Sequence, residues 1–206
     1  MVHQDLKWSD YILHDENSLL RILSNRVNGL KKVCYAASFK QRKTVADGIF
    51  MSKLIYIIQV WGGCENYLLK SLQIIQNKAA RVVTKLKWDT PVGTLLSQCG
   101  WLSIRQLIWY HSVILVHRIR LSKVPKYLYN MYNFNEEKNV QTRQTGLKLI
   151  SLKNMKAPKS ELARRGFRWR SFQDYNLLPL DIRSIATIDT FKKRAKIWAN
   201  ENISPV

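Results

Sequence analysis

The stretch that decides the fold runs from Val60 to Leu102 and reads VWGGCENYLLKSLQIIQNKAARVVTKLKWDTPVGTLLSQCGWL. Residues 65–86 have the period of an α-helix, because apolar side chains recur at steps of three and four. These side chains, which we expect to share one buried face, are Leu68, Leu72, Ile75, Ala79, Val82, Val83 and Leu86. A second face carries, at the same steps, Lys70, Gln73, Asn77, Arg81 and Lys85. No acid lies between Glu65 and Asp89, so the second face is positive and lacks local partners.

This positive face has two interpretations. In the first it is a solvated outer surface, as most charged helix faces are. In the second the helix lies along a phosphate backbone, because Arg and Lys neutralise phosphates while Asn and Gln bond phosphate oxygens or sugars. The candidate nucleic-acid-binding residues of this helix are therefore Lys70, Gln73, Asn77, Arg81 and Lys85.

The composition favours a polyanionic partner. The chain has 206 residues, 46% of them apolar, and a formal net charge of +20. Such a charge favours nucleic acid first and an anionic membrane surface second. No apolar run approaches the roughly 18 residues of a membrane span, and the N-terminal residues contain no apolar signal core. We therefore expect an intracellular protein without a membrane partner, and the sequence does not distinguish nucleus from cytoplasm.

The rest of the chain is also mainly helical in its pattern. We expect one helix over residues 18–36 and a second over 40–60, which opens with a capping box at Ser38 and Gln41. Within the second helix, Gly48 costs about 1 kcal/mol of propensity, which close packing or a kink would explain. Thr90 and Pro91 fit the N-cap and first position of a short helix over 91–98. Further helices are predicted over 104–121, behind a second capping box at Ser103 and Gln106, and over 187–198. Between them, Pro125 begins a short tyrosine-rich segment over 126–132.

The part of the chain between residues 133 and 170 has a different character. The hydrophobic period fades over residues 133–166, where we expect basic loops with short extended pieces, either as a solvated linker or as an arm on nucleic acid. In the stretch that follows, Phe167 and Trp169 alternate with Arg168 and Arg170, which is a strand period. Aromatic rings beside arginines suit single-stranded nucleic acid, so Arg168, Trp169 and Arg170 join the candidate binding residues. The competing interpretation places both rings in the core.

The cysteines and histidines indicate no metal or cofactor site. The odd count and wide spacing of Cys34, Cys64 and Cys99 favour reduced, mostly buried thiols. The four histidines do not pair with the cysteines at zinc spacings. His111 and His117 lie six residues apart, which puts them on different faces of one helix.

Several motifs in a fixed order resemble a known family. They are V-W-G-G at 60–63, L-Q-I-I-Q-N-K-A-A-R-V-V-T at 72–84, W-D-T-P at 88–91, L-L-S-Q-C-G-W-L at 95–102 and F-R-W-R at 167–170. Together they resemble the region downstream of the palm in reverse transcriptases of non-LTR retrotransposons, jockey-like elements in particular. The resemblance implies a helical thumb that grips the duplex leaving the active site, followed by a C-terminal extension.

On this basis we expect a mainly α fold with one short strand or hairpin, organised in five parts. Residues 1–14 would be the end of the palm, 15–87 a thumb-like three-helix bundle and 88–132 a second helical segment. Residues 133–166 would be a basic, loop-rich linker, and 167–206 an aromatic and basic segment with a final helix.

The catalytic residues of the resembled polymerase are missing. Its chemistry needs paired carboxylates that hold two metal ions, and this chain has no Asp-Asp pair. We therefore expect no enzymatic activity from this chain alone. The expected function is sequence-independent binding of RNA or an RNA–DNA duplex, with the missing palm and fingers as a possible protein partner. Two alternatives are a helical protein-interaction module and a non-functional remnant that folds poorly.

Overall fold

A computed structural model describes residues 18–134, 150–152 and 158–204 of the chain, which are mainly helical. The expected region at residues 1–14 lies outside this description, as does most of the expected linker. The chain divides after Leu107 into two compact units, which are described separately below.

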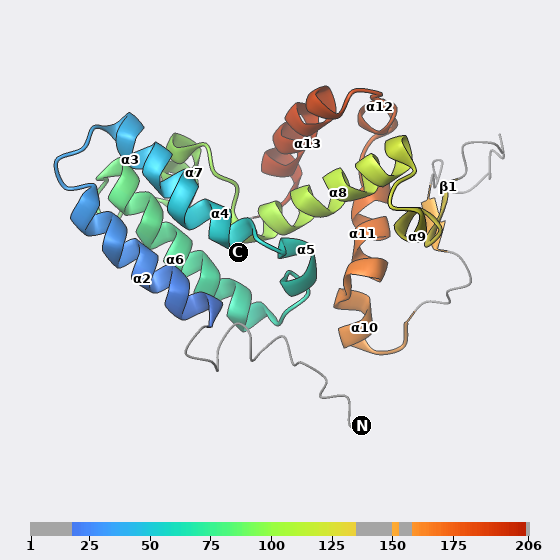
Figure 1. Cartoon of the computed structure of the whole chain (residues 1–206), viewed down its shortest axis with the longest axis horizontal. Helices are drawn as coiled ribbons and strands as arrows, with labels where there is room; N and C mark the ends of the chain where they lie inside the picture. The colour runs from blue at the N-terminus through green and yellow to red at the C-terminus, as the bar shows by residue number, and fades with distance from the viewer. Residues whose placement is uncertain (1–17, 135–149, 153–157, 205–206) are drawn as a thin grey trace. The chain divides into compact units, whose positions relative to one another are not determined.

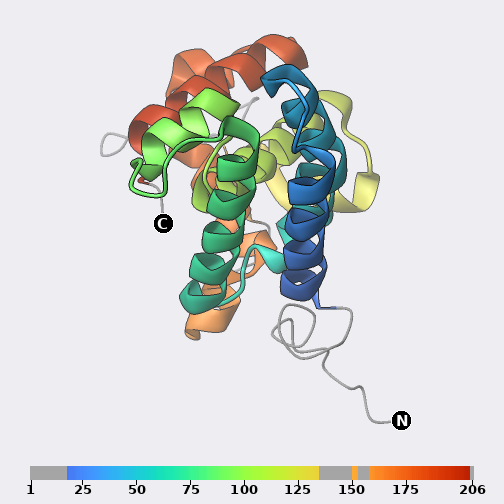
Figure 2. The ribbon, with the colours of Figure 1, turned by 90° about the vertical axis from the view of Figure 1, so that its left-hand side faces the viewer.

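The first unit is a bundle of helices in which α2 (Leu19–Val33) and α6 (Asn66–Thr84) lie side by side (Figures 1 and 2). The other elements are α3 (Phe39–Ala46), the π-helical turn η1 (Asp47–Met51), α4 (Ser52–Ile55), α5 (Ile58–Trp61) and α7 (Val92–Cys99). The helix α8 (Ile104–Ser122), which has 19 residues like α6, begins at the end of this unit and continues into the next.

The apolar face predicted for the central helix forms the middle of this core. Leu68, Leu72, Ile75, Ala79 and Val83 of α6 are buried as expected, and Val82 and Leu86 are half-buried. The buried arc is wider than the prediction and also includes Leu69, Gln73, Gln76 and Ala80. It is wider because α6 packs against α2, α3 and α7, so three sides of the helix are covered.

A network of buried amides joins α6 to the start of α8. The Nε2 of Gln76 donates to the carbonyl of Leu102 at 2.9 Å. The Oε1 of Gln73 accepts from the backbone N–H of Ile104 at 2.9 Å, and its Nε2 donates to Gln76 and Asn77. The two glutamine side chains thus satisfy one backbone group each, the carbonyl just before α8 and the N–H at its first residue. Burying either group without a partner would be costly.

The helix predicted over residues 40–60 is interrupted, so that prediction is wrong in its extent. The capping box of Ser38 and Gln41 is present, but the helix passes into the π-helical turn η1 and ends at Ile55. Ile57 then adopts a left-handed conformation with φ of 54° before α5 begins. Gly48 lies inside η1, and no atom would touch a Cβ added there, so close packing does not explain that glycine.

The short helix predicted over residues 91–98 begins one position later than expected. It is α7, and Pro91, rather than Thr90, occupies its N-cap without a side-chain hydrogen bond. The second capping box is confirmed: the Oε1 of Gln106 accepts from the N–H of Ser103, whose Oγ accepts from the N–H of Gln106.

The second unit is built around the apolar part of α8. Three helices contribute to its core, namely α11 (Phe167–Asn176), α12 (Leu180–Arg183) and α13 (Ile188–Asn202). The short helices α9 (Lys126–Tyr129) and α10 (Glu161–Arg165) complete its helical elements. One antiparallel pair, β1 (Tyr132–Phe134) with β2 (Ile150–Leu152), places Tyr132 opposite Leu152.

A buried histidine connects three helices of this unit. His117 of α8 lies parallel to Phe191 of α13, with 3.7 Å between the ring centroids. Its Nδ1 lies 2.8 Å from the hydroxyl of Tyr175 in α11, and its Nε2 lies 2.9 Å from the carbonyl of Ile185. Burial lowers the pKa of His117 to about 4, so the ring is neutral at pH 7. The Nε2–H then donates to Ile185 while Nδ1 accepts from Tyr175.

The strand predicted at residues 167–170 is wrong. These residues form the first turn of α11 instead. Trp169 packs edge-to-face on Phe172, three positions along the helix, with ring centroids 4.8 Å apart. That contact requires helical spacing, so the alternation of aromatic and basic residues is only a local coincidence with a strand period. The two strands of the small sheet lie earlier in the chain, at Tyr132–Phe134 and Ile150–Leu152.

The amide network gives a first prediction. Replacing Gln76 by alanine leaves the buried carbonyl of Leu102 without its donor, and we expect a loss of about 1–3 kcal/mol in the free energy of unfolding. The measurement is urea denaturation followed by helical circular dichroism. Lys70→Ala on the exposed side of the same helix is the matched control, with an expected change within about 0.5 kcal/mol. Equal effects of the two substitutions would contradict the structural role of Gln76.

Candidate nucleic-acid interface

The exposed side of α6 forms a stripe of basic and apolar side chains. Its members lie three or four positions apart, which places them on one face of the helix. They are Tyr67, Lys70, Ile74, Lys78, Arg81 and, at the C-cap, Lys85. We call this set the α6 stripe. Lys70, Lys78 and Lys85 are exposed and Arg81 is half-buried.

Three of the predicted binding residues of this helix, Lys70, Arg81 and Lys85, belong to the stripe. Gln73 does not, and this corrects the expected polar face. Only 4% of Gln73 is exposed, and both ends of its amide are engaged inside the unit. Asn77 lies half-buried beside the stripe, where its Oδ1 accepts from Gln73 at 2.8 Å. The polarity of an amide does not reveal which side of a helix it occupies, because buried amides serve backbone groups.

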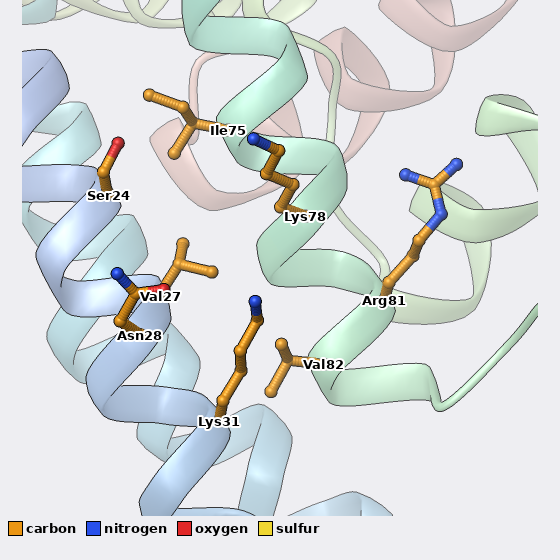
Figure 3. Close-up of a pocket in the computed structure, with 8 residues that line it drawn as sticks. All are labelled: Ser24, Val27, Asn28, Lys31, Ile75, Lys78, Arg81 and Val82. Carbon is orange, nitrogen blue, oxygen red and sulfur yellow. The ribbon is translucent and has the colours of Figure 1, made fainter. Parts of the chain in front are cut away.

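A groove of about 470 Å³ runs between α2 and α6. It is lined from α2 by Ser24, Val27, Asn28 and Lys31, and from α6 by Ile75, Lys78, Arg81 and Val82. Figure 3 shows the amino groups of Lys31 and Lys78 extending into the space between the two helices, whereas the guanidinium of Arg81 points away from α2. Lys31 and Lys78 are not among the binding residues predicted from the sequence. The eight-residue step from Lys70 to Lys78 is a helical repeat and could have indicated the latter.

Acids are scarce around the stripe and the groove. Residues 18–107 contain 14 lysines and arginines but three acids, Asp47, Glu65 and Asp89. Asp47 is engaged on both oxygens, by Lys43 at 2.5 Å and by the indole N–H of Trp101 at 2.7 Å. Glu65 is the N-cap of α6, at the end opposite Lys85. Among the described residues, the lining of the groove contains no acid, so no carboxylate of the lining offsets the charges of Lys31, Lys78 and Arg81.

Two cations of the stripe also hold the backbone at the C-terminal end of α6. The Nη2 of Arg81 donates to the carbonyl of Trp88 at 3.0 Å, and the Nζ of Lys85 donates to the carbonyl of Tyr35 at 3.0 Å. Lys85 itself adopts a left-handed conformation with φ of 58°. The positions of both charged groups are therefore restricted. By contrast, no hydrogen bond to another residue of the described ranges limits the reach of Lys70 and Lys78 toward a ligand.

The candidates of the second unit are placed differently. Arg168 is exposed, but Trp169 is half-buried and packs against the core of its unit. Arg170 is half-buried, donates to the carbonyl of Arg165 at 3.3 Å and lies 3.9 Å from the carboxylate of Asp174. The structure thus does not bring Arg168, Trp169 and Arg170 together as one open surface, and the ring of Trp169 serves packing.

The carboxyl group of Asp174 is unusual in this setting. Burial raises its pKa from 3.8 to about 7, and the positive charge of Arg170 offsets this only in part. At 3.9 Å, the Nε of Arg170 is too distant to donate a strong hydrogen bond to the Oδ2 of Asp174. The carboxyl group of Asp174 is therefore only partly ionised near neutral pH.

The described residues contain no cluster of three or more His, Cys, Asp or Glu side chains that could hold a metal ion. Cys34, Cys64 and Cys99 are buried thiols without a disulfide. In the described ranges, no helix combines the length and the apolarity that a membrane span requires.

Comparison with known proteins adds no relative. No protein-family model matches the chain, and neither a curated protein nor a solved structure shows significant similarity to it.

Asp174 gives a prediction about pH. The folded protein retains a proton that the unfolded chain releases near pH 3.8, so this group stabilises the fold at low pH and loses that contribution as pH rises through 7. Asp174→Asn removes the titration. As pH rises from 4 to 8, the free energy of unfolding of the variant should increase by about 1 kcal/mol or more relative to that of the unmodified protein.

The measurement is the free energy of unfolding in urea at several pH values. Asp181→Asn, which alters an exposed carboxylate of the same unit, is the control and should follow the profile of the unmodified protein. A difference between Asp174→Asn and the unmodified protein that stays constant with pH would contradict the raised pKa.

Proposed function

We propose that this chain is the non-catalytic, C-terminal part of a reverse transcriptase of a non-LTR retrotransposon, and that it binds RNA or a template–primer duplex through charge. The family assignment is supported by the ordered sequence motifs. The binding is supported by one structural observation above all: the lysines and arginine of the α6 stripe line up on one side of a rigid helix beside the basic groove.

The dimensions of the stripe fit a nucleic-acid strand. Lys85 lies fifteen positions after Lys70, and at 1.5 Å per position along a helix this is about 22 Å. Successive phosphates of one strand rise by about 3.4 Å, so the stripe spans roughly six of them. The cations of the stripe, with Lys31 across the groove, supply charges along that length.

The contact would not depend on base sequence. Lysine and arginine neutralise phosphates whatever bases these carry. With about six phosphates neutralised, the logarithm of affinity should fall against the logarithm of salt concentration with a slope near −5. This mode of binding needs neither a metal nor a cofactor. The chain would contribute nucleic-acid binding, and not catalysis, to the polymerase.

A helical protein-interaction module is the second candidate, and one observation favours it. Tyr67 and Ile74 are both about half exposed and lie between the lysines of the α6 stripe. Exposed apolar side chains within a charged surface suit a protein contact. In that case the partner would be an acidic protein surface or the palm and fingers of the parent polymerase.

Charge reversal distinguishes the two candidates. Lys70→Glu combined with Lys78→Glu changes two exposed side chains of the stripe without altering any buried group. For an RNA–DNA duplex, we expect the affinity to fall at least tenfold and the salt slope to become shallower by about 2, because each lysine accounts for about one phosphate. Fluorescence anisotropy across a salt series measures both quantities.

Lys193→Glu combined with Arg194→Glu is the matched control. It makes the same change in net charge on exposed positions of α13 in the other unit. Equal losses in the two double variants would mean that overall charge, and not the α6 stripe, carries the binding. Unchanged duplex binding in the Lys70 and Lys78 variant, with intact helicity, would favour the protein-interaction module.

A further inference from the structure

Two aromatic side chains at one end of the first unit are almost fully exposed. Among the large apolar side chains in the described residues, Trp88 at 84% and Tyr35 at 83% are the most exposed. The contrast with the other described tryptophans is sharp, since each of those is buried or half-buried. Tyr35 follows α2 and Trp88 follows α6, and Figure 1 shows these two helices ending at the same end of the unit.

The backbone that carries these rings is firmly held. Lys85, three positions before Trp88, donates from its Nζ to the carbonyl of Tyr35 at 3.0 Å. Arg42, which is buried, donates from its Nε to the carbonyl of Val83 at 2.7 Å and from its Nη1 to the carbonyl of Ala37. Arg42 and Lys85 therefore tie the turn after α2 to the end of α6. The rings project from a fixed frame rather than from a loose loop.

Cations lie close to both aromatic residues in the sequence. Lys31 and Lys32 occupy the last turn of α2, and Lys85 and Lys87 precede Trp88. Asp89 is the one acid in this sequence neighbourhood between residues 85 and 95. Lys31 also lines the groove between α2 and α6, so the basic groove leads to the end of the unit where the rings lie.

We propose that Tyr35 and Trp88 form a stacking platform for unpaired bases, and that the ligand of this end of the unit is single-stranded nucleic acid. The bases lie on the two rings while the phosphates follow Lys31, Lys85 and the rest of the α6 stripe. The inference rests on the proposed function and narrows it, because a flat ring recognises the face of a base that pairing and stacking would conceal in a duplex.

The chemistry of the patch favours this ligand over an acidic protein. An acidic peptide would be matched by the lysines, but it offers no flat surface to the rings. Unpaired bases offer such a surface, and stacking is worth enough per base to affect binding strongly. The exposed faces of Tyr35 and Trp88 beside lysines combine both requirements within one fixed frame.

The experiment compares single-stranded and duplex ligands on the full chain. Fluorescence anisotropy measures binding of oligouridylate and of an RNA–DNA duplex of equal length to the unmodified protein, Trp88→Ala, Tyr35→Ala and the control Tyr127→Ala. Tyr127 is a similarly exposed tyrosine in the other unit. We expect Trp88→Ala to weaken oligouridylate binding about 5- to 150-fold, Tyr35→Ala to weaken it in the same direction, and Tyr127→Ala to leave it unchanged.

Three further results are expected if the platform exists. Duplex affinity should change less than twofold in Trp88→Ala. The salt slope should stay the same, since no phosphate contact is removed. Tryptophan fluorescence should be quenched by oligouridylate in the unmodified protein, and most of that quenching should be lost in Trp88→Phe, a variant that keeps an aromatic ring and the fold.

Other outcomes would overturn the platform. Equal losses for oligouridylate and duplex, or no loss in Trp88→Ala, would exclude base stacking at these rings. Polyglutamate could also compete with oligouridylate for the protein. If Trp88→Ala weakened polyglutamate binding as much as it weakened oligouridylate binding, the ligand would be an acidic protein instead. The proposed function fails separately: an unmodified protein that binds neither nucleic acid at low salt, or a Lys70 and Lys78 double variant that binds normally, would reject charge-based binding itself.

Discussion

The buried amides of Gln73 and Gln76 fix the position on which the candidate interface depends. Through them α6 holds the carbonyl of Leu102 and the N–H of Ile104, two backbone groups just before and at the start of α8. A half-satisfied network of this kind would destabilise the core, whereas a satisfied one specifies a single arrangement. With this side of α6 committed to the interior, the opposite side, with Lys70, Ile74 and Lys78, is the one left to solvent.

The two termini of α6 are stabilised by residues of opposite charge, and this difference determines where the basic surface lies. At the start, Glu65 is the N-cap, where a negative charge suits the partial positive charge of the helix end. At the finish, Arg81 and Lys85 donate to carbonyls beyond the helix, which suits the partial negative charge there. Cations that stabilise a helix terminus are also available as a basic surface, so a structural role and a binding role coincide at one end of the unit.

Much of the fold was predictable because it follows from local rules. The apolar period located α6 and α8, and the capping boxes at Ser38 and Ser103 marked helix starts within one residue. The break at Ile57 was not predictable, since a β-branched residue seldom adopts a positive φ and only tertiary packing imposes it. The alternation at residues 167–170 misled for a similar reason, because four residues are too few to separate a strand period from a helix turn.

The candidate site shows where sequence reasoning stops. Periodicity identified Lys70, Arg81 and Lys85, which the helix places along one face, but it grouped Gln73 with them although Gln73 is buried. The residues that α2 contributes to the groove could not be predicted from the sequence, since the packing of the whole core decides which helix lies beside α6. Lys31 therefore joins Lys78 only in three dimensions. The exposure of Tyr35 and Trp88 was equally hidden, because aromatic residues are more often buried.

The left-handed conformation of Ile57, between α4 and α5, changes which residues suit this position. In a regular helix, glycine is among the least favourable replacements for isoleucine. At Ile57 the preference reverses, because glycine adopts a φ of 54° without steric conflict and the isoleucine side chain is 42% exposed. The positive φ of Ile57 is therefore a local cost, which the burial of its neighbours Leu54 and Ile58 offsets.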